Sequence, residues 1–469
     1  MVEFASGSLI FLFSVLLIEA LFFRYTSTFI WCKGMVMAHR TRLLSTQDYK
    51  TLSLSAFGGA LEFYDFIIFV FFSKVIGALF FPADMPVWLS QLQTFGIFAA
   101  GYLARPFGGV VMAHFGDVFG RKRMFTLSIL LMAVPTLLIG CLPTYALVGY
   151  AAPILLLVLR VCQGLAVGGE IPGAWTFVAE HVPKNRVGLA CGTLTSGLTL
   201  GIFLGSLVAI IMQSNFNAEE MNRWAWRIPF IIGGIFGFIT MYLRRWLKET
   251  PVFLEMKQRL EKEEHKKLPV WSVLSKHLPQ VLISMLLTWI LSAGIMVIII
   301  TAHVYLQGQF GFSEMEVSIT RLYATVGLAV GCVVSGYLTD LFGIGKVLMV
   351  GCIGVVVATL IFLASLTGDR ALLYVTYPLV GFSIGIVGCF AYYMVRAFPA
   401  HLRYSGVSFA FNVAYAITGA LTSFLMPLLA SFFSKYAAGS YVIAIYCVGA
   451  LLGGYFILAK TEEHLSKDI

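Results

Sequence analysis

Charge is the scarce component of this sequence. Asp, Glu, Lys and Arg together make up 12% of its 469 residues, roughly half the share that soluble domains carry. Hydrophobic residues make up 59%, and the mean hydropathy is +0.88. A chain with so few charges cannot cover its apolar surface in water. The composition excludes a soluble globular protein and predicts an outer surface that lies in lipid.

Motifs that mark enzymes are also missing. The eight cysteines are scattered and form no CxxC pair, so they indicate apolar packing rather than disulfides or metal ligands. We find no metal-ligand cluster, no nucleophile–base motif and no phosphate-binding loop. We therefore expect neither an enzyme nor a bound metal or cofactor. The net charge of +9 does not predict a nucleic-acid partner, because the basic residues lie in short turns between apolar runs.

Long uninterrupted apolar runs are what the sequence has instead. Barrel strands alternate in polarity over roughly 10 residues, whereas these runs are continuous over about 18–25 residues, the length of a membrane-spanning helix. Helices also satisfy the backbone internally, as lipid requires. We predict an all-α membrane protein with about twelve such helices, at residues 51–72, 91–113, 124–142, 148–180, 188–212, 227–246, 278–304, 317–338, 347–367, 372–398, 405–432 and 440–459.

The runs predict a division of the chain into two six-helix bundles. The N-terminal bundle covers residues 51–247 and the C-terminal bundle residues 278–460. A charged, helix-prone stretch at 248–277 reads as a cytoplasmic linker or a regulatory docking site, and 461–469 form a cytoplasmic tail. Lys and Arg gather in alternate loops, which by the positive-inside rule places both ends of the twelve-helix core in the cytoplasm.

Residues 1–50 precede this core as an N-terminal extension. Its apolar run at 8–23 contains Glu19 and has no basic segment in front of it, so it does not resemble a secretory signal. Two alternatives stay open. Either the run is a thirteenth spanning helix, or translation begins at Met35 or Met37 and residues 1–34 are absent from the mature protein.

An internal repeat relates the two bundles. Residues 116–123 read GDVFGRKR and residues 339–346 read TDLFGIGK, so that Asp117 matches Asp340 and Gly120 matches Gly343. Both stretches follow the second helix of their bundle and face the same side of the membrane. Parallel repeats of this kind enclose a cavity near the bilayer midplane and rock against each other around it.

These stretches resemble a known family. The GDVFGRK loop is similar to the loop signature of the major facilitator superfamily, and LEFYDF at 61–66, ARPFGG at 104–109, RVCQGLAVGGE at 160–170 and WAWRIPF at 224–230 resemble its metabolite:proton symporter branch. That branch includes proline/betaine, 2-oxoglutarate, citrate and shikimate symporters of the bacterial cytoplasmic membrane. The resemblance implies uptake driven by the proton gradient. Val118, Leu341 and Ile344 stand where the family often has basic residues.

Two acidic residues in the first helix are the predicted proton-coupling site. Glu62 and Asp65 are three residues apart and so share one face of that helix. Ionisable groups inside a bilayer are costly and usually functional. A carboxylate in a low-dielectric environment beside another takes up a proton more readily than one in water.

Arg160, in the middle of the fourth predicted helix, is the expected partner of these acids or of a substrate carboxylate. Its planar guanidinium matches the geometry of a carboxylate. An exchange between the two partners would couple proton and substrate movement. Glu170, further along the same helix, is predicted to belong with Arg160 to the substrate or ion-pair site, and the inner gate and the proton path stay open as alternatives.

The cytoplasmic ends of the helices are predicted to form an inner gate. Asp117 is expected to accept hydrogen bonds from a helix N-terminus near Tyr404 in the other bundle. The residues assigned to this gate are Arg105, Gly116, Asp117, Gly120, Arg121, Lys122, Arg123, Glu180, Asp340 and Arg403.

Together these features predict a monomeric, proton-coupled symporter that imports a small carboxylate or zwitterionic metabolite by alternating access. The expected partners are the solute, protons and the lipid bilayer. A proton-coupled exporter, a facilitator without proton coupling and a non-transporting membrane sensor remain as alternatives.

Overall fold

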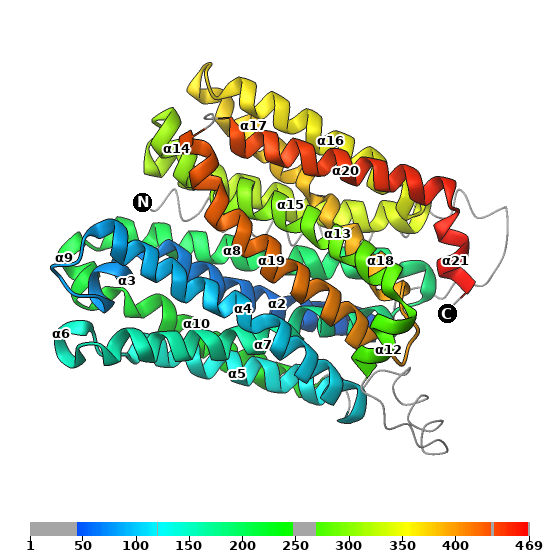
Figure 1. Ribbon diagram of the computed structural model, residues 1–469, viewed down its shortest axis with the longest axis horizontal. Coiled ribbons are helices and arrows are strands. Elements are labelled where there is room, and N and C mark those ends of the chain that lie inside the picture. Colours follow the sequence, from blue (N-terminus) through cyan, green and yellow to red (C-terminus); the bar gives the residue numbers. More distant parts are fainter. Residues whose placement is uncertain (1–44, 120, 247–268, 433–435, 468–469) are drawn as a thin grey trace. The chain divides into compact units, whose positions relative to one another are not determined.

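The computed structural model describes residues 45–119, 121–246, 269–432 and 436–467 (Figure 1). Across these residues the chain is helical and contains no strand. The apolar run at 8–23 and most of the linker, 247–268, lie outside the described residues. So do the side chains of Glu62, Asp117 and Arg121, and Gly120 as a whole.

The first half of the core, α2–α10, follows the predicted runs closely. Ser45 opens α2 with a reciprocal capping box to Asp48, which satisfies backbone donors at the helix start. The principal helices are α2 (Thr46–Phe71), α3 (Ser73–Phe80), α4 (Val87–Phe119), α5 (Arg121–Cys141), α7 (Ala151–His181), α8 (Val187–Asn215) and α10 (Arg227–Arg244), with the short α6 (Tyr145–Val148) and α9 (Ala218–Glu220) between them.

The second half, α12–α21, begins with a short helix and contains two interrupted spans. Its helices are α12 (Pro269–Lys276), α13 (Leu278–Gly294), α14 (Ala302–Phe310), α15 (Glu314–Phe342), α16 (Ile344–Ser365), α17 (Leu373–Ile384), α18 (Phe390–Arg396), α19 (Arg403–Phe432), α20 (Ala437–Leu458) and α21 (Thr461–Lys467). A π-helical turn, η4 (Ile295–Ile300), follows α13, and a 3₁₀ turn, η6 (Gly385–Cys389), joins α17 to α18.

The spans match the prediction in number. Among the described residues, eleven helical segments are long and apolar enough to cross a membrane. The 30-residue α19 corresponds to the predicted run at 405–432 and supplies the twelfth. The predicted all-α membrane bundle is confirmed.

Each half packs mainly within itself. In the first half α4 lies along α7, α2 along α8, and α5 along α10; in the second, α15 lies along α17 and α16 along α20. Figure 1 shows these neighbours running side by side, blue to green in the first half and green through yellow to red in the second. Contact between the halves is concentrated in two places, where α8 meets α15 and where α19 meets α4 and α7.

Glycines set how closely α8 and α15 approach. A Cβ added at Gly188 would lie 2.5 Å from the carbonyl oxygen of Gly336, and one at Gly192 would lie 2.4 Å from that of Cys332. Small residues permit such backbone contact between membrane helices, where no hydrophobic force draws the helices together. The two halves are therefore joined along α8 and α15 by backbone-to-backbone packing.

Candidate functional site

A buried polar cluster joins α2, α5 and α7. Asp65, Arg160 and Gln163 are each 3% exposed. The Gln163 side-chain amide donates to Asp65 Oδ2 at 2.7 Å, and its carbonyl oxygen accepts from Arg160 Nη1 at 2.9 Å. Asp65 and Arg160, which the sequence predicted as partners, are thus brought together with Gln163 between them.

The orientation of the Gln163 amide follows from its neighbours. Arg160 can only donate, so it must face the Gln163 carbonyl oxygen, and the amide nitrogen is left to face Asp65. The same nitrogen also donates to the Thr136 hydroxyl at 2.8 Å, and that hydroxyl donates to the Met132 carbonyl at 2.8 Å. This series of hydrogen bonds makes Asp65 Oδ2 an acceptor. The Asp65 carboxyl is therefore either ionised or protonated on its other oxygen, Oδ1.

Arg105 lies at the same place rather than with the predicted gate residues. It is 3% exposed and stacks beneath aromatic rings, with its guanidinium carbon 4.6 Å from the centre of Tyr415 and 5.6 Å from that of Tyr102. Tyr415 belongs to α19, so its contact with Arg105 of α4 joins the second half to the cluster. From the sequence, Arg105 is expected at the inner gate because it lies near the inner end of the second predicted helix.

The cluster lines a small cavity. Asp65, Arg105, Arg160 and Gln163 all face it, together with apolar residues of α4, α5 and α7. The volume open to the centre of a water molecule is about 10 Å³, close to the least that holds a single water. All of the lining comes from the first half. The site is therefore closed around its polar groups in this structure, and a solute larger than water does not fit in the cavity as it stands.

Hydrogen-bonding capacity is left over inside this cavity. Nε and Nη2 of Arg105, the same two atoms of Arg160, and Oδ1 of Asp65 have no hydrogen-bond partner among the described residues. Arg160 instead stacks on Phe69, with its guanidinium carbon 3.7 Å from the ring centre. Buried polar groups are normally paired, so the nitrogens of Arg105 and Arg160 leave unused hydrogen-bond donors in this cavity.

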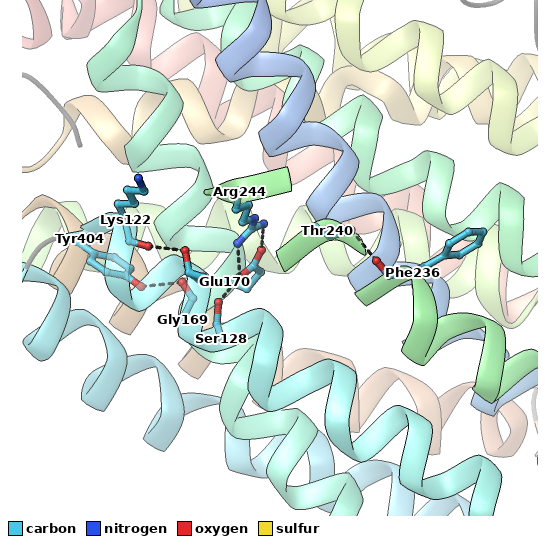
Figure 2. Close-up of polar contacts among 9 residues, drawn as sticks. Lys122, Ser128, Gly169, Glu170, Phe236, Thr240, Arg244 and Tyr404 are labelled. Carbon is cyan, nitrogen blue, oxygen red and sulfur yellow. Dashed lines mark hydrogen bonds and ion pairs between the residues drawn. The ribbon is translucent and has the colours of Figure 1, made fainter. Parts of the chain in front are cut away.

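A second buried charge pair lies nearby on α7. Glu170 forms an ion pair with Arg244, whose Nη1 lies 3.2 Å from Oε2, and the Ser128 hydroxyl donates to the same carboxylate. Figure 2 shows Glu170 between Arg244 and Ser128. Arg244 is fully buried, 0% exposed, and lies against Gly58 of α2. Arg244 is the last residue of α10 and lies near the end of the predicted run at 227–246, yet its side chain is inside the bundle.

The predicted gate residues Glu180 and Arg403 meet across the two halves. Glu180 Oε1 on α7 lies 3.1 Å from Arg403 Nη1 on α19, and both residues are buried. The hydroxyl of the next residue on α19, Tyr404, donates to the Gly169 carbonyl of α7 at 2.8 Å (Figure 2). Ser408 donates to the Gly109 carbonyl at 2.9 Å. The ends of α4, α7 and α19 that are predicted to face the cytoplasm are therefore closed against each other.

Asp340 makes the kind of contact that was expected of Asp117. Its carboxylate accepts from the backbone nitrogens of Gly188 at 2.7 Å and Leu189 at 2.8 Å. These nitrogens begin α8, where the helix dipole favours an anion. Asp340 thus ties α15 of the second half to the start of α8 in the first.

The other loop residues are only partly described. A Cβ added at Gly116 would lie 2.4 Å from the Tyr404 ring, so the first-half loop and α19 are in close contact. Lys122 Nζ donates to the Arg245 carbonyl at 3.3 Å, and Arg123 is exposed. The side chains of Glu62, Asp117 and Arg121, and Gly120 as a whole, lie outside the described residues, so their predicted roles stay predictions.

We expect Arg403→Gln to open the cytoplasmic end, because it leaves the buried Glu180 carboxylate without a cation. Ser408→Cys, a position 0% exposed in this structure, reports on that opening. In inside-out vesicles a membrane-impermeant maleimide should label Ser408→Cys faster when Arg403→Gln is also present. Labelling at the same rate with and without Arg403→Gln would contradict a gating role for this pair.

Two members of the site were missed by sequence reasoning. Gln163 follows Arg160 by three residues and so shares its face of the helix, a signal that was available. Arg244 carried no such signal, because its neighbours Arg245 and Trp246 resemble a membrane-surface segment. Only the packing of α10 against α5 and α2 brings Arg244 to Glu170.

Curated relatives cover nearly the whole chain. A shikimate transporter of Escherichia coli strain K12 is 30% identical over 447 residues, which cover 91% of this chain and 98% of the relative. An inner membrane metabolite transport protein of the same strain is 30% identical over 434 residues, covering 87% and 96%. A glycine betaine/proline/ectoine/pipecolic acid transporter of Dickeya dadantii is 28% identical over 412 residues, covering 86% and 82%.

Solved structures share the fold. A proton:xylose symporter bound to a deoxyglucose derivative superimposes with a TM-score of 0.72 at 15% identity, covering 88% of this chain and 96% of that one. The family model of the Major Facilitator Superfamily matches residues 56–423. This chain therefore belongs to the Major Facilitator Superfamily and is a membrane transporter of that fold.

Proposed function

We propose that the protein imports a small carboxylate-bearing metabolite together with protons, across a bacterial inner membrane. One observation carries the proposal. Two buried arginines, Arg105 and Arg160, face a single cavity with one described carboxylate, Asp65, and each keeps nitrogens without a partner. An excess of buried cation over anion is costly unless another anion binds. A solute carboxylate supplies that anion.

The relatives favour the same class of solute. Proline, betaine, ectoine, pipecolic acid and shikimate, named among the relatives, all carry a carboxylate. Arg presents a planar fork that binds a carboxylate through two parallel hydrogen bonds. Arg105 and Arg160 are the residues we assign to this contact. The aromatic rings that stack on Arg105 would pack against the remainder of the solute.

Asp65 is the residue we assign to the coupling proton. Ionised, it shares the cluster with Arg160 through Gln163 and offsets part of the arginine charge. When Asp65 is protonated, this negative charge is lost and the arginines are free to attract the solute carboxylate. Proton and solute binding would in this way favour each other, which is the requirement for symport.

Alternating access supplies the movement between the two faces. The closed contacts at the predicted cytoplasmic end, Glu180–Arg403 and Asp340 at the start of α8, would hold the inward path shut while the solute enters from outside. Their separation would open the inward path around the same site. The proton leaves Asp65 for the cytoplasm and restores its partnership with Gln163 and Arg160.

An uptake screen tests the function. Purified protein in liposomes, with an acidic exterior, is offered radiolabelled proline, glycine betaine, pipecolate and shikimate. We expect at least one of them to accumulate above its equilibrium level and to lose that accumulation when a protonophore is added. Uptake that is indifferent to the protonophore would favour a facilitator. Accumulation of the solute only in liposomes with an acidic interior, where protons leave as the solute enters, would favour the exporter.

Arg160→Lys separates charge from geometry. Lysine keeps the positive charge but loses the fork, so we expect the KM for the transported carboxylate to rise about tenfold or more, since the loss of one charge-assisted hydrogen bond is worth roughly 1.5–3 kcal/mol. Initial-rate uptake over a range of solute concentrations measures this. An unchanged KM would remove Arg160 from the solute site.

A further inference from the structure

Another buried arginine, Arg321, lies away from the cluster already described. Arg321 on α15 is 5% exposed and was not singled out from the sequence. It stands seven residues after the start of α15 at Glu314, or roughly 10 Å along the helix. That end of α15 is the one predicted to face outward. Arg321 therefore lies about two turns below the outer surface.

The environment of Arg321 is aromatic and lies between the halves. Its guanidinium carbon lies 4.2 Å from the ring centre of Phe71 at the end of α2, a cation–π contact between the first and second halves. A ring on the guanidinium face leaves the N–H groups at its edge free to donate. Nε of Arg321 is buried and has no hydrogen-bond partner among the described residues.

No described carboxylate pairs with Arg321. Two acidic residues begin its helix. Glu314 lies within electrostatic range of Arg321 but accepts a hydrogen bond from Gln213 of α8 at 3.1 Å, and Glu316 pairs with Arg370 at 3.5 Å. The Tyr377 hydroxyl is also within electrostatic range of Arg321. His303 on α14 lies within electrostatic range of both Arg321 and the exposed Lys74 of α3. The His303 Nδ1 donates to the Ile300 carbonyl at 2.9 Å, because a carbonyl can only accept.

We propose that Arg321 is an outer recognition site for the carboxylate of the solute, formed where α15 meets α2, through which the solute passes before it reaches Arg105 and Arg160. Phe71 covers one face of the guanidinium and leaves the edge for the anion. The exposed Lys74 adds positive potential at the entrance, which raises the local concentration of anionic solutes.

This inference rests on the proposed function for the identity of the solute, but the presence of an anion site can be tested without transport. Phe71→Cys puts a thiol where the ring now covers the guanidinium. Its rate of reaction is compared for two thiol reagents of similar size, the anionic sulfonatoethyl methanethiosulfonate and the cationic trimethylammonioethyl methanethiosulfonate. The parent chain without Phe71→Cys is labelled in parallel to subtract reaction at its own cysteines.

With Arg321 present, the anionic reagent should react faster than the cationic one. We expect Arg321→Gln to lower the ratio of the two rates about tenfold, the effect of removing one charge a few ångströms away in a water-like environment. Arg321→Lys should keep most of the ratio. Arg370→Gln is the matched control, because Arg370 is an exposed outer arginine, 3.5 Å from Glu316, and should leave the ratio unchanged. A ratio that Arg321→Gln does not alter overturns the site.

The second arm links the site to the solute. For whichever carboxylate the uptake screen identifies, Arg321→Gln should raise KM several-fold while Vmax changes little, because the chemistry of proton binding at Asp65 is untouched. An altered labelling ratio with an unchanged KM would overturn the solute role. If the screen finds no transported solute, the proposed function fails, while the labelling ratio still decides whether Arg321 presents an anion site.

Discussion

Asp65→Asn is expected to abolish uphill accumulation of the solute while leaving solute exchange intact. Asparagine keeps an oxygen that accepts from Gln163, so the hydrogen-bonded cluster with Arg160 persists, but it cannot bind or release a proton. In proteoliposomes with an imposed pH gradient, the solute should therefore reach only its equilibrium distribution. Counterflow, which exchanges labelled for unlabelled solute without a gradient, should continue.

Asp84→Asn provides the control for this experiment. Asp84 is an exposed residue in the outer turn after α3, and its substitution should leave accumulation unchanged. Full accumulation by Asp65→Asn would remove Asp65 from the coupling pathway. Glu62, the other predicted carboxylate, would then be the next residue to test by Glu62→Gln.

Arg244→Met is expected to cause the largest loss of stability of any single substitution at these charge pairs. It leaves Glu170, 2% exposed, as a buried carboxylate without its cation. Removing one partner of a buried ion pair typically costs about 3–5 kcal/mol. Unfolding of the purified protein in mixed detergent micelles, followed by tryptophan fluorescence, measures the free energy of unfolding.

A double substitution separates the cost of the unpaired charge from the loss of packing. Glu170→Leu combined with Arg244→Met removes both charges and fills similar volume, so it should recover most of the stability lost by Arg244→Met alone, as is found for other buried pairs. A double variant that is no more stable than Arg244→Met would show that the pair is not what stabilises this part of the bundle. Activity of the double variant would further show whether Glu170 has a role beyond structure.

Helix positions were predictable because one property of the chain determines them. A bilayer requires a continuous apolar run of a given length, and the twelve runs found by that rule correspond to helices within a few residues. The break at η4 was not predicted, since the Ile295–Ile300 turn is as apolar as the helix around it. The Tyr377 hydroxyl donates to the Ile298 carbonyl at 2.5 Å within that turn, a contact between distant residues that no local pattern contains.

Pairing of the polar residues was predictable only in part. Asp65 and Arg160 were expected to lie together because an ionised side chain inside a bilayer is costly unless it pairs with one of opposite charge. The same rule applies to Arg321, which lies within the predicted run at 317–338 and was overlooked there. Arg105 and Arg244 depend on how their helices are rotated against the neighbours, and the sequence alone does not give that rotation. The apolar pattern runs all round these helices and leaves no distinct inner face.

A proton flux measurement tests the central claim most directly. Lightly buffered proteoliposomes without a preset pH gradient are given the transported solute, and the external pH is followed with an electrode. If solute and proton move together, the external medium becomes alkaline as the solute enters, and Asp65→Asn gives no such change. Solute entry without any alkalinisation in the unaltered protein would contradict proton-coupled import at this site.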